Sequence, residues 1–214
     1  MKQGSKQLGK AFLGLALGLV WLIPFYLMVT NSFKTKQEIF TNPLKFPEAF
    51  TFENYPEAFR QLDFIRTLAN SLLITVSSVI VIVIFSAMAA YALERIKSKF
   101  STITFMVFVA AMLVPFQSVM IPLVALFGKA QMLNQIGIIF MYLGFGGSMS
   151  IFLYHGAMKS IPRALDEAAI IDGASRWQVF WKVIFPMLKP TTVTVAVLNT
   201  MWIWNDYLLP SLVI

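Results

Sequence analysis

The chain has 214 residues, no cysteine and one histidine, and only 13% of its residues are charged, with a net charge of +7. A hydrophobic fraction of 58% excludes a disordered protein, and the lack of cysteine excludes disulfide-stapled domains, thiolate catalysis and cysteine-based metal sites. Five long stretches carry no charge at all: 11–33, 67–93, 100–128, 130–158 and 190–205. Because the helices of a soluble protein need a polar face, this distribution indicates a multi-spanning membrane protein.

The continuity of the apolar runs indicates helices, since a membrane β-barrel would alternate apolar and polar residues in short segments. The positive net charge does not indicate a nucleic-acid partner, because no basic block interleaves with aromatic residues. In a membrane protein, lysine and arginine report topology first. We therefore expect an all-α, polytopic transmembrane helix bundle that holds no metal.

A helix needs about 20 apolar residues to cross the hydrocarbon core of a bilayer. This length predicts five spans, at 11–32, 69–93, 102–127, 136–157 and 190–209. The first span is too long for the apolar region of a signal peptide and lacks a small-residue cleavage site, so we expect it to be retained. Pro24, Pro115 and Pro122 lie inside the predicted spans and predict kinks there.

The distribution of basic residues predicts the orientation of the chain. If the N-terminus is cytoplasmic, most lysines and arginines fall in inside segments, around Lys97 and Lys159, whereas those of the outside loop 34–66 are balanced by acids. The positive-inside rule therefore favours a cytoplasmic N-terminus. Asn42-Pro43 and Phe46-Pro47 predict turns within the outside loop.

The inside segment 157–189 predicts two short helices. Pro162 suits the first turn of a helix over 163–171, and Gly173 ends that helix because glycine tolerates the left-handed conformation of a helix terminus. Ser175 is placed to cap a second helix, which Pro186 closes. Its expected apolar stripe consists of Trp177, Phe180, Trp181 and Ile184. An amphipathic loop on the membrane surface is the alternative interpretation.

The same segment resembles the EAA motif of ATP-binding-cassette (ABC) importer permeases, E-A-A-x3-G-x9-I-x-L-P. Glu167, Ala168, Ala169, Gly173 and Pro186 match this pattern directly, while Val183 and Phe185 are conservative departures. In that family the segment forms coupling helices, which dock into a cleft of the nucleotide-binding subunit and transmit its ATP-driven closure. The resemblance implies an ATPase-coupling role for Glu167, Ala168, Ala169, Asp172, Gly173, Phe180 and Pro186.

Three further stretches resemble carbohydrate-uptake permeases: Phe46–Tyr55, Asn70–Leu93 and Trp204–Pro210. Together these resemblances cover nearly the whole chain and indicate the second permease of a maltose-type or glycerol-phosphate-type importer. That family has a sixth span beyond this point. The resemblance therefore implies that residues 1–214 form a single permease domain, incomplete at its C-terminus, in a fragment or a truncated protein.

The implied function is a non-catalytic transport subunit in the plasma (inner) membrane of a prokaryote, which moves a sugar or oligosaccharide by alternating access. The sequence has no G-x-x-x-x-G-K-[ST] loop, so the chain itself needs no cofactor and ATP would bind to a separate ABC ATPase dimer. The other implied partners are a second homologous permease and an extracytoplasmic sugar-binding protein.

Three alternatives stay open at this point. One is an importer for another polar solute, such as glycerol phosphate or a polyamine. Another is a membrane scaffold or sensor that binds an ATPase. A membrane-embedded enzyme is the third, but it would need convergent acids, histidine or cysteine at membrane depth, and the predicted spans offer almost none.

Polar residues inside spans are candidates for the substrate pathway. Those of this chain are Gln117, Ser148, Ser150 and Asn199. Each of them can equally bond to a neighbouring helix. Gly144, Gly146 and Gly147 leave room either for a sugar or for close helix packing, of which packing is favoured. His155 is expected near the inner interface rather than in a proton relay.

Overall fold

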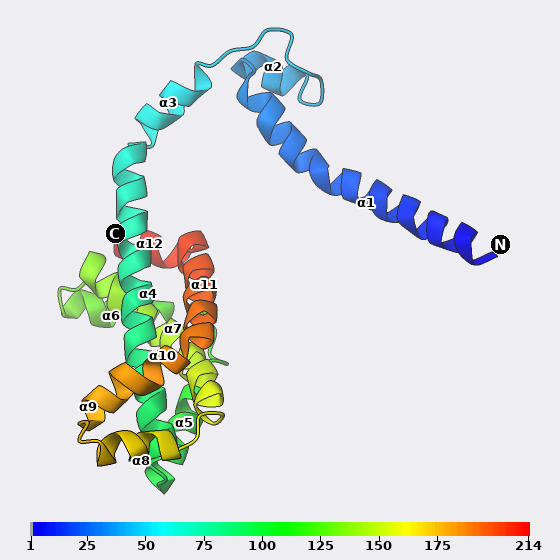
Figure 1. Cartoon of the computed structure of the whole chain (residues 1–214). Coiled ribbons are helices and arrows are strands. Elements are labelled where there is room, and N and C mark those ends of the chain that lie inside the picture. Colours follow the sequence, from blue (N-terminus) through cyan, green and yellow to red (C-terminus); the bar gives the residue numbers. More distant parts are fainter. Residues whose placement is uncertain (1) are drawn as a thin grey trace. The chain divides into compact units, whose positions relative to one another are not determined.

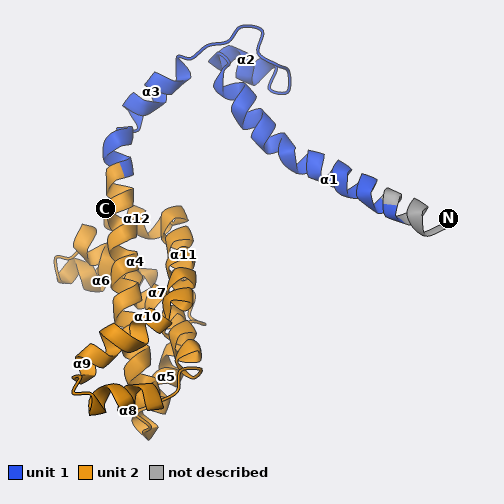
Figure 2. Ribbon diagram, in the orientation of Figure 1, with its two compact units in different colours: residues 1–68 blue, residues 69–214 orange. Residues whose placement is uncertain are grey.

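The structure is a computed structural model that describes residues 2–214, and helices make up 80% of the chain, with no strand in the described range. The all-α prediction is confirmed. The chain forms two compact units, residues 1–68 and 69–214 (Figure 2). Three helices are each long and apolar enough to cross a membrane, and two strongly bent helix pairs bring the number of candidate spans to as many as five.

The first unit contains α1 (Lys2–Ser32), α2 (Lys36–Thr41) and α3 (Asn54–Gln61). A buried lysine organises the segment after α1: the ammonium of Lys34 donates to Asn31 Oδ1 at 2.8 Å and to the Asn42 carbonyl at 2.9 Å. The Asn54 amide donates to the carbonyls of Ser32 and Lys34. The loop over 34–66 is therefore folded on its own polar contacts, and Asn42 ends α2, where a turn was predicted.

The second unit is built around α4 (Phe64–Arg95) and α7 (Gln135–Met158) (Figure 1). Its other helices are α5 (Lys99–Ala111), α6 (Phe116–Lys129), α8 (Ala164–Ile171), α9 (Arg176–Gln178), the π-helix η1 (Val179–Ile184), α10 (Phe185–Met187), α11 (Lys189–Asn205) and α12 (Leu208–Val213). Helix α7 packs against α5, α11 and α12. The fold core thus gathers around α7.

The third predicted span, 102–127, is a bent pair of helices, and the kink predicted at Pro115 is a complete break. Helices α5 and α6 meet there at an angle of 106°. Pro115 causes the break, because proline has no amide hydrogen and disfavours helical backbone at the residue before it. Pro115 itself is extended, with φ −69° and ψ 140°. Pro24 and Pro122, in contrast, lie within α1 and α6 without ending either helix.

The predicted end of the fifth span at residue 209 is wrong, since α11 ends at Asn205. Asp206 leaves the helix, and its carboxylate accepts hydrogen bonds from the amides of Leu208 at 3.1 Å and Leu209 at 3.4 Å. These bonds satisfy the first two amides of the separate helix α12, whose N-cap is the next residue, Tyr207. The Tyr142 hydroxyl also donates to Asp206, at 3.0 Å, and ties this corner to α7.

Candidate coupling site

Helix α8 ends where the sequence predicts and begins one residue later than predicted, at Ala164, because Arg163 is its N-cap. It follows Pro162, and Asp166 and Glu167 lie in its first turn, where they complement the helix dipole. At its end Gly173 has φ +86°, the left-handed region. The Gly173 amide donates to the Ile170 carbonyl at 3.0 Å and the Ala174 amide to the Ala169 carbonyl at 2.9 Å. These two bonds form a Schellman motif, which directs the chain sharply away from α8.

The second helix starts as predicted. Ser175 Oγ accepts from the Gln178 amide at 3.3 Å, while Gln178 Oε1 accepts from the Ser175 amide at 2.8 Å, which completes a capping box. The predicted end is wrong by one residue, because the helical chain continues past Pro186 to Met187 before bending by 76° into α11.

The predicted apolar stripe of this helix is wrong in part, because residues 179–184 form a π-helix. Its wider turn changes which side chains share a face. Val179, Phe180, Ile184 and Leu188 are buried, whereas Trp177 is 59% exposed. Phe180 packs against Tyr91 of α4, with ring centroids 5.3 Å apart. Phe180 therefore fastens η1 to α4.

A buried ion pair joins α8 to the end of α4. Arg95 Nη2 lies 2.9 Å from Asp166 Oδ2, and the two side chains are only 13% and 11% exposed. The Tyr91 hydroxyl donates to the other oxygen of the same carboxylate, at 2.7 Å. A buried ion pair holds a fixed geometry when further groups also hydrogen-bond to its charged atoms. Figure 1 shows α8 lying across this end of α4.

Two further hydrogen bonds to backbone carbonyls reinforce the pair, one donated from the α8 side to α4 and one donated from α4 to the segment before α8. Arg163, just before α8, donates to the Glu94 carbonyl at 2.6 Å, and Arg95 donates to the Ile161 carbonyl at 3.3 Å. We call the side chains of Tyr91, Arg95, Arg163 and Asp166 the α4–α8 latch. Sequence analysis missed the latch as a unit; its only signal was an acid in the first turn of α8 and an arginine in the last turn of α4.

The outward surface of α8 carries most residues of the EAA motif. Glu167, Ala168 and Ile170 are exposed, Ile171 is 84% exposed, and Ala169 is half-buried. Within residues 2–214, the Glu167 carboxylate makes no ion pair. An acid beside small and apolar side chains forms a surface of the kind that docks against another protein. The exposed Asp172 and Gly173 lie at the end of this surface.

The polar residues predicted for the substrate pathway occupy different environments. Ser150 and Asn199 are buried between α7 and α11, where the Asn199 amide donates to Ser150 Oγ at 3.0 Å and to the Val195 carbonyl at 2.8 Å. Ser148 is buried in α7, and Gln117 is exposed in the first turn of α6. The structure thus brings together two of the four.

The glycines of α7 divide in the same way. A Cβ on Gly146 would collide with Asn199 Oδ1 and would lie 2.8 Å from Ile82 Cδ1, whereas a Cβ on Gly144 meets nothing within 4 Å. Close packing is thus the role of Gly146. Elsewhere, His155 Nε2 lies 3.2 Å from Glu94 Oε2 at the end of α7. Within residues 2–214 no group of three or more potential acidic, histidine or cysteine ligands surrounds a metal position.

The chain is similar to known transport proteins, and the matched residues include α8 and the helices around it. Residues 82–214 match the family described as the binding-protein-dependent transport system inner membrane component. The chain is 58% identical over 203 residues to the probable starch degradation products transport system permease protein AmyC of Thermoanaerobacterium thermosulfurigenes, covering 95% of this chain and 74% of that protein. It is 38% identical to the multiple sugar-binding transport system permease protein MsmG of Streptococcus mutans, covering 92% and 72%.

A solved structure agrees over the whole length. A chain of a bacterial ABC transporter involved in the import of the acidic polysaccharide alginate superposes with a TM-score of 0.85 at 25% sequence identity. The match covers 100% of this chain and 76% of that one.

Proposed function

Because this chain belongs to the family of binding-protein-dependent transport system inner membrane components, we propose that it carries a sugar or oligosaccharide through the membrane of an ABC importer. The observation that carries the substrate class is the 58% identity, over 95% of the chain, to a permease named for starch degradation products. The relatives MsmG and the melibiose/raffinose/stachyose permease MelC of Bacillus subtilis are also named for sugars.

The outward surface of α8 is the proposed dock for an ATPase subunit. Glu167 supplies a charge for a basic partner group, and the exposed Ala168 allows close approach of the partner backbone. Asp172 and Gly173 set where this surface ends, and Phe180 and Pro186 hold the helix behind it. Hydrolysis of ATP belongs to the partner in this scheme, and the permease itself catalyses no reaction.

The α4–α8 latch supports a mechanical route from the ATPase to the membrane. A displacement of α8 acts on Asp166, and Arg95 and Tyr91 pass it to α4 because both bond the same carboxylate. Alternating access needs such a two-state element that is biased from both ends. A second homologous permease would complete the pathway, and an extracytoplasmic sugar-binding protein would deliver the substrate.

In this proposal the N-terminus is cytoplasmic and the membrane is the inner membrane of a prokaryote. Gln117, Ser148, Ser150 and Asn199 are kept as pathway candidates. Gln117 is the one whose exposed amide is free to meet a sugar hydroxyl without first breaking a contact between α7 and α11.

The test is uptake of radiolabelled solutes by cells from which only this permease has been deleted. We expect loss of uptake for a malto-oligosaccharide or a raffinose-type sugar, and recovery with the wild-type gene. Loss of glycerol phosphate or polyamine uptake instead would replace the substrate class. Unchanged uptake of all these solutes, with an ATPase still co-purifying with the protein, would favour the scaffold alternative.

A further inference from the structure

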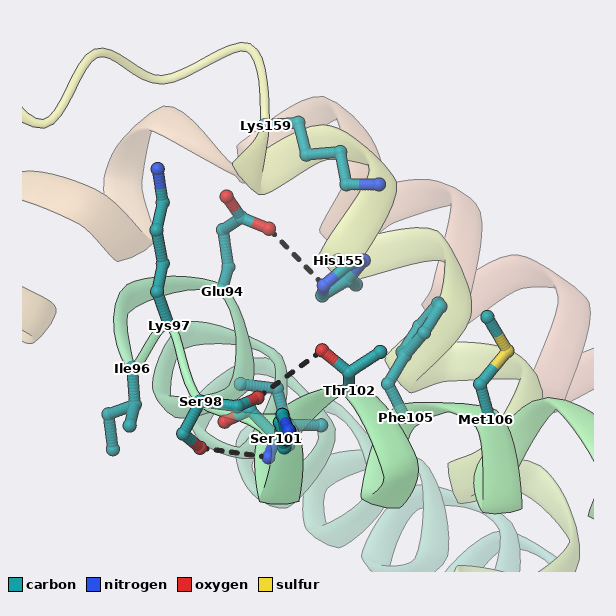
Figure 3. A pocket seen from close by; sticks show the side chains of 12 residues that line it. Glu94, Ile96, Lys97, Ser98, Ser101, Thr102, Phe105, Met106, His155 and Lys159 are labelled. Atoms are coloured by element: carbon teal, nitrogen blue, oxygen red, sulfur yellow. Dashed lines mark hydrogen bonds and ion pairs between the residues drawn. The ribbon is translucent and has the colours of Figure 1, made fainter.

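A cleft of about 470 Å³ opens between the end of α4, the beginning of α5 and the end of α7. Figure 3 shows its lining, with Lys97 at the left of the view, Lys159 at the top, and Phe105 and Met106 at the right. It lies where two membrane-length helices, α4 and α7, come to an end. The cleft is separate from the exposed surface of α8 and from the α4–α8 latch side chains.

The polar part of the cleft is strongly basic. Lys97, Lys99 and Lys159 all line it and are exposed, and none of them takes part in an ion pair within the described residues. The one acid of the lining, Glu94, is already paired with His155. Three lysines therefore line the cleft against a single carboxylate, so its lining carries an excess of positive charge, which favours an anionic ligand.

The apolar part of the lining consists of Leu93, Ile96, Phe105 and Met106, beside the hydroxyl groups of Ser98, Ser101 and Thr102. Phe105 stacks on the His155 ring with centroids 3.9 Å apart, and this pair closes the inner wall. Ile96 and Met106 line the cleft as exposed side chains. A small inorganic anion would leave this apolar surface in contact with water. A ligand that satisfies both parts must carry an anionic group and a hydrocarbon chain.

We propose that the cleft binds an anionic phospholipid, with the phosphate held by Lys97, Lys99 and Lys159 and an acyl chain lying along Ile96 and Met106. Basic pockets at the cytoplasmic ends of spans recognise such headgroups, and the bilayer around α4 and α7 supplies the ligand. This inference does not rest on the transported solute, since the lipid acts on the outside of the helix bundle.

The experiment is a titration of phosphatidylglycerol into the protein purified in a neutral detergent, followed by native mass spectrometry, with phosphatidylcholine as the comparison lipid. We expect retention of phosphatidylglycerol over phosphatidylcholine. Each cation near a membrane surface contributes roughly a fivefold factor in affinity, so the Lys97→Gln, Lys99→Gln, Lys159→Gln variant should bind phosphatidylglycerol about a hundredfold more weakly.

The matched control removes the same charge elsewhere, by Lys36→Gln, Lys45→Gln and Lys129→Gln, which are all exposed lysines that do not line the cleft. This variant should bind like wild type. Equal weakening in both variants, or no preference for phosphatidylglycerol in wild type, would overturn the proposal.

A second arm separates a lipid from a free phosphate ion. Ile96→Ser with Met106→Ser removes the apolar wall but keeps all three lysines. Weaker phosphatidylglycerol binding by this variant, with inorganic phosphate unable to displace the lipid, is the expected result. Unchanged lipid binding together with full displacement by inorganic phosphate would show a site for the ion and contradict the lipid assignment.

Discussion

At the scale of single residues, Asp166 is the acid on which the attachment of α8 depends. Its carboxylate meets Arg95 at 2.9 Å and Tyr91 at 2.7 Å while almost buried. We expect Arg95→Gln to lower the free energy of unfolding by about 3–5 kcal/mol, because the buried carboxylate loses its cation. Arg95→Lys should recover part of this, since it keeps the charge but loses the planar guanidinium, whose Nη2 reaches both Asp166 and the Ile161 carbonyl.

The measurement for this variant is chemical unfolding in detergent, compared with a pair outside the latch. Arg60 also contacts a carboxylate, that of Glu57 at 2.7 Å, but the two side chains are 79% and 42% exposed. Arg60→Gln should leave the free energy of unfolding unchanged within error, because exposed ion pairs contribute little to stability. If Arg95→Gln also left the free energy of unfolding unchanged, the latch would not stabilise the attachment of α8 to α4.

A second prediction at this scale concerns Gly173, where the backbone conformation alone decides the effect of a substitution on stability. A Cβ there meets nothing within 4 Å, but φ is +86°. Gly173→Ala should therefore cost about 1–2 kcal/mol from left-handed strain, and Gly173→Asn clearly less, since asparagine tolerates this conformation. Thermal unfolding in detergent tests the order. Equal stability of the alanine and asparagine variants would show that the chain relaxes away from this turn.

At the scale of elements, the contact between α7 and α11 depends on one of two neighbouring glycines. Gly146→Ala places a methyl group against Asn199 Oδ1 and Ile82 Cδ1, so we expect a loss of about 1–3 kcal/mol from overpacking. Gly144→Ala is the matched control on the same helix. It meets open space and should be neutral or slightly stabilising, because alanine favours helix.

Both glycine variants are tested by heating the purified permease in detergent and then measuring how much of it still binds the proposed partner subunits. A loss of stability with Gly144→Ala as large as with Gly146→Ala would mean that helix α7 tolerates no alanine there for reasons other than the Asn199 contact. Wild-type behaviour of both would show that α7 and α11 separate easily, as expected for a wall of the substrate pathway.

The success of sequence analysis also differs by element. The ends of α8 and the start of α9 were predictable because Pro162, Gly173 and Ser175 act within a single turn of backbone. The kink at Pro115 was also predictable from the proline, although its angle of 106° was not. The π-helix was not predictable, since it changes the register of an apolar run whose periodicity looks helical throughout. The latch joins residues 75 positions apart, Tyr91 and Asp166, and no local pattern encodes such a pairing.

At the scale of the whole molecule, a hydrogen bond at one end and an ion-pair contact at the other align α4 with α7. Gln135, the first residue of α7, donates to Asn70 near the start of α4 at 3.1 Å, and His155 near the end of α7 meets Glu94 near the end of α4. The two helices therefore run in the same direction. The intervening α5 and α6 must return the chain across the membrane, so the bent pair acts as one crossing.

The same alignment makes a prediction about sidedness. If α4 and α7 both end in the cytoplasm, Ile171 on α8 faces the cytoplasm and Leu133, just before α7, faces outside. Both side chains are exposed, and the chain has no cysteine, so Ile171→Cys and Leu133→Cys each create a single thiol. A membrane-impermeant maleimide should label Leu133→Cys in intact cells and Ile171→Cys only in inverted vesicles.

Addition of the ATPase subunit then extends the labelling experiment from topology to docking. Because Ile171 lies on the surface proposed to meet the ATPase, the subunit should slow the labelling of Ile171→Cys, while Leu133→Cys reacts as before. Labelling of Ile171→Cys in intact cells would reverse the orientation inferred from charge. Labelling from the inside that the ATPase does not slow would keep the orientation and move the dock away from α8.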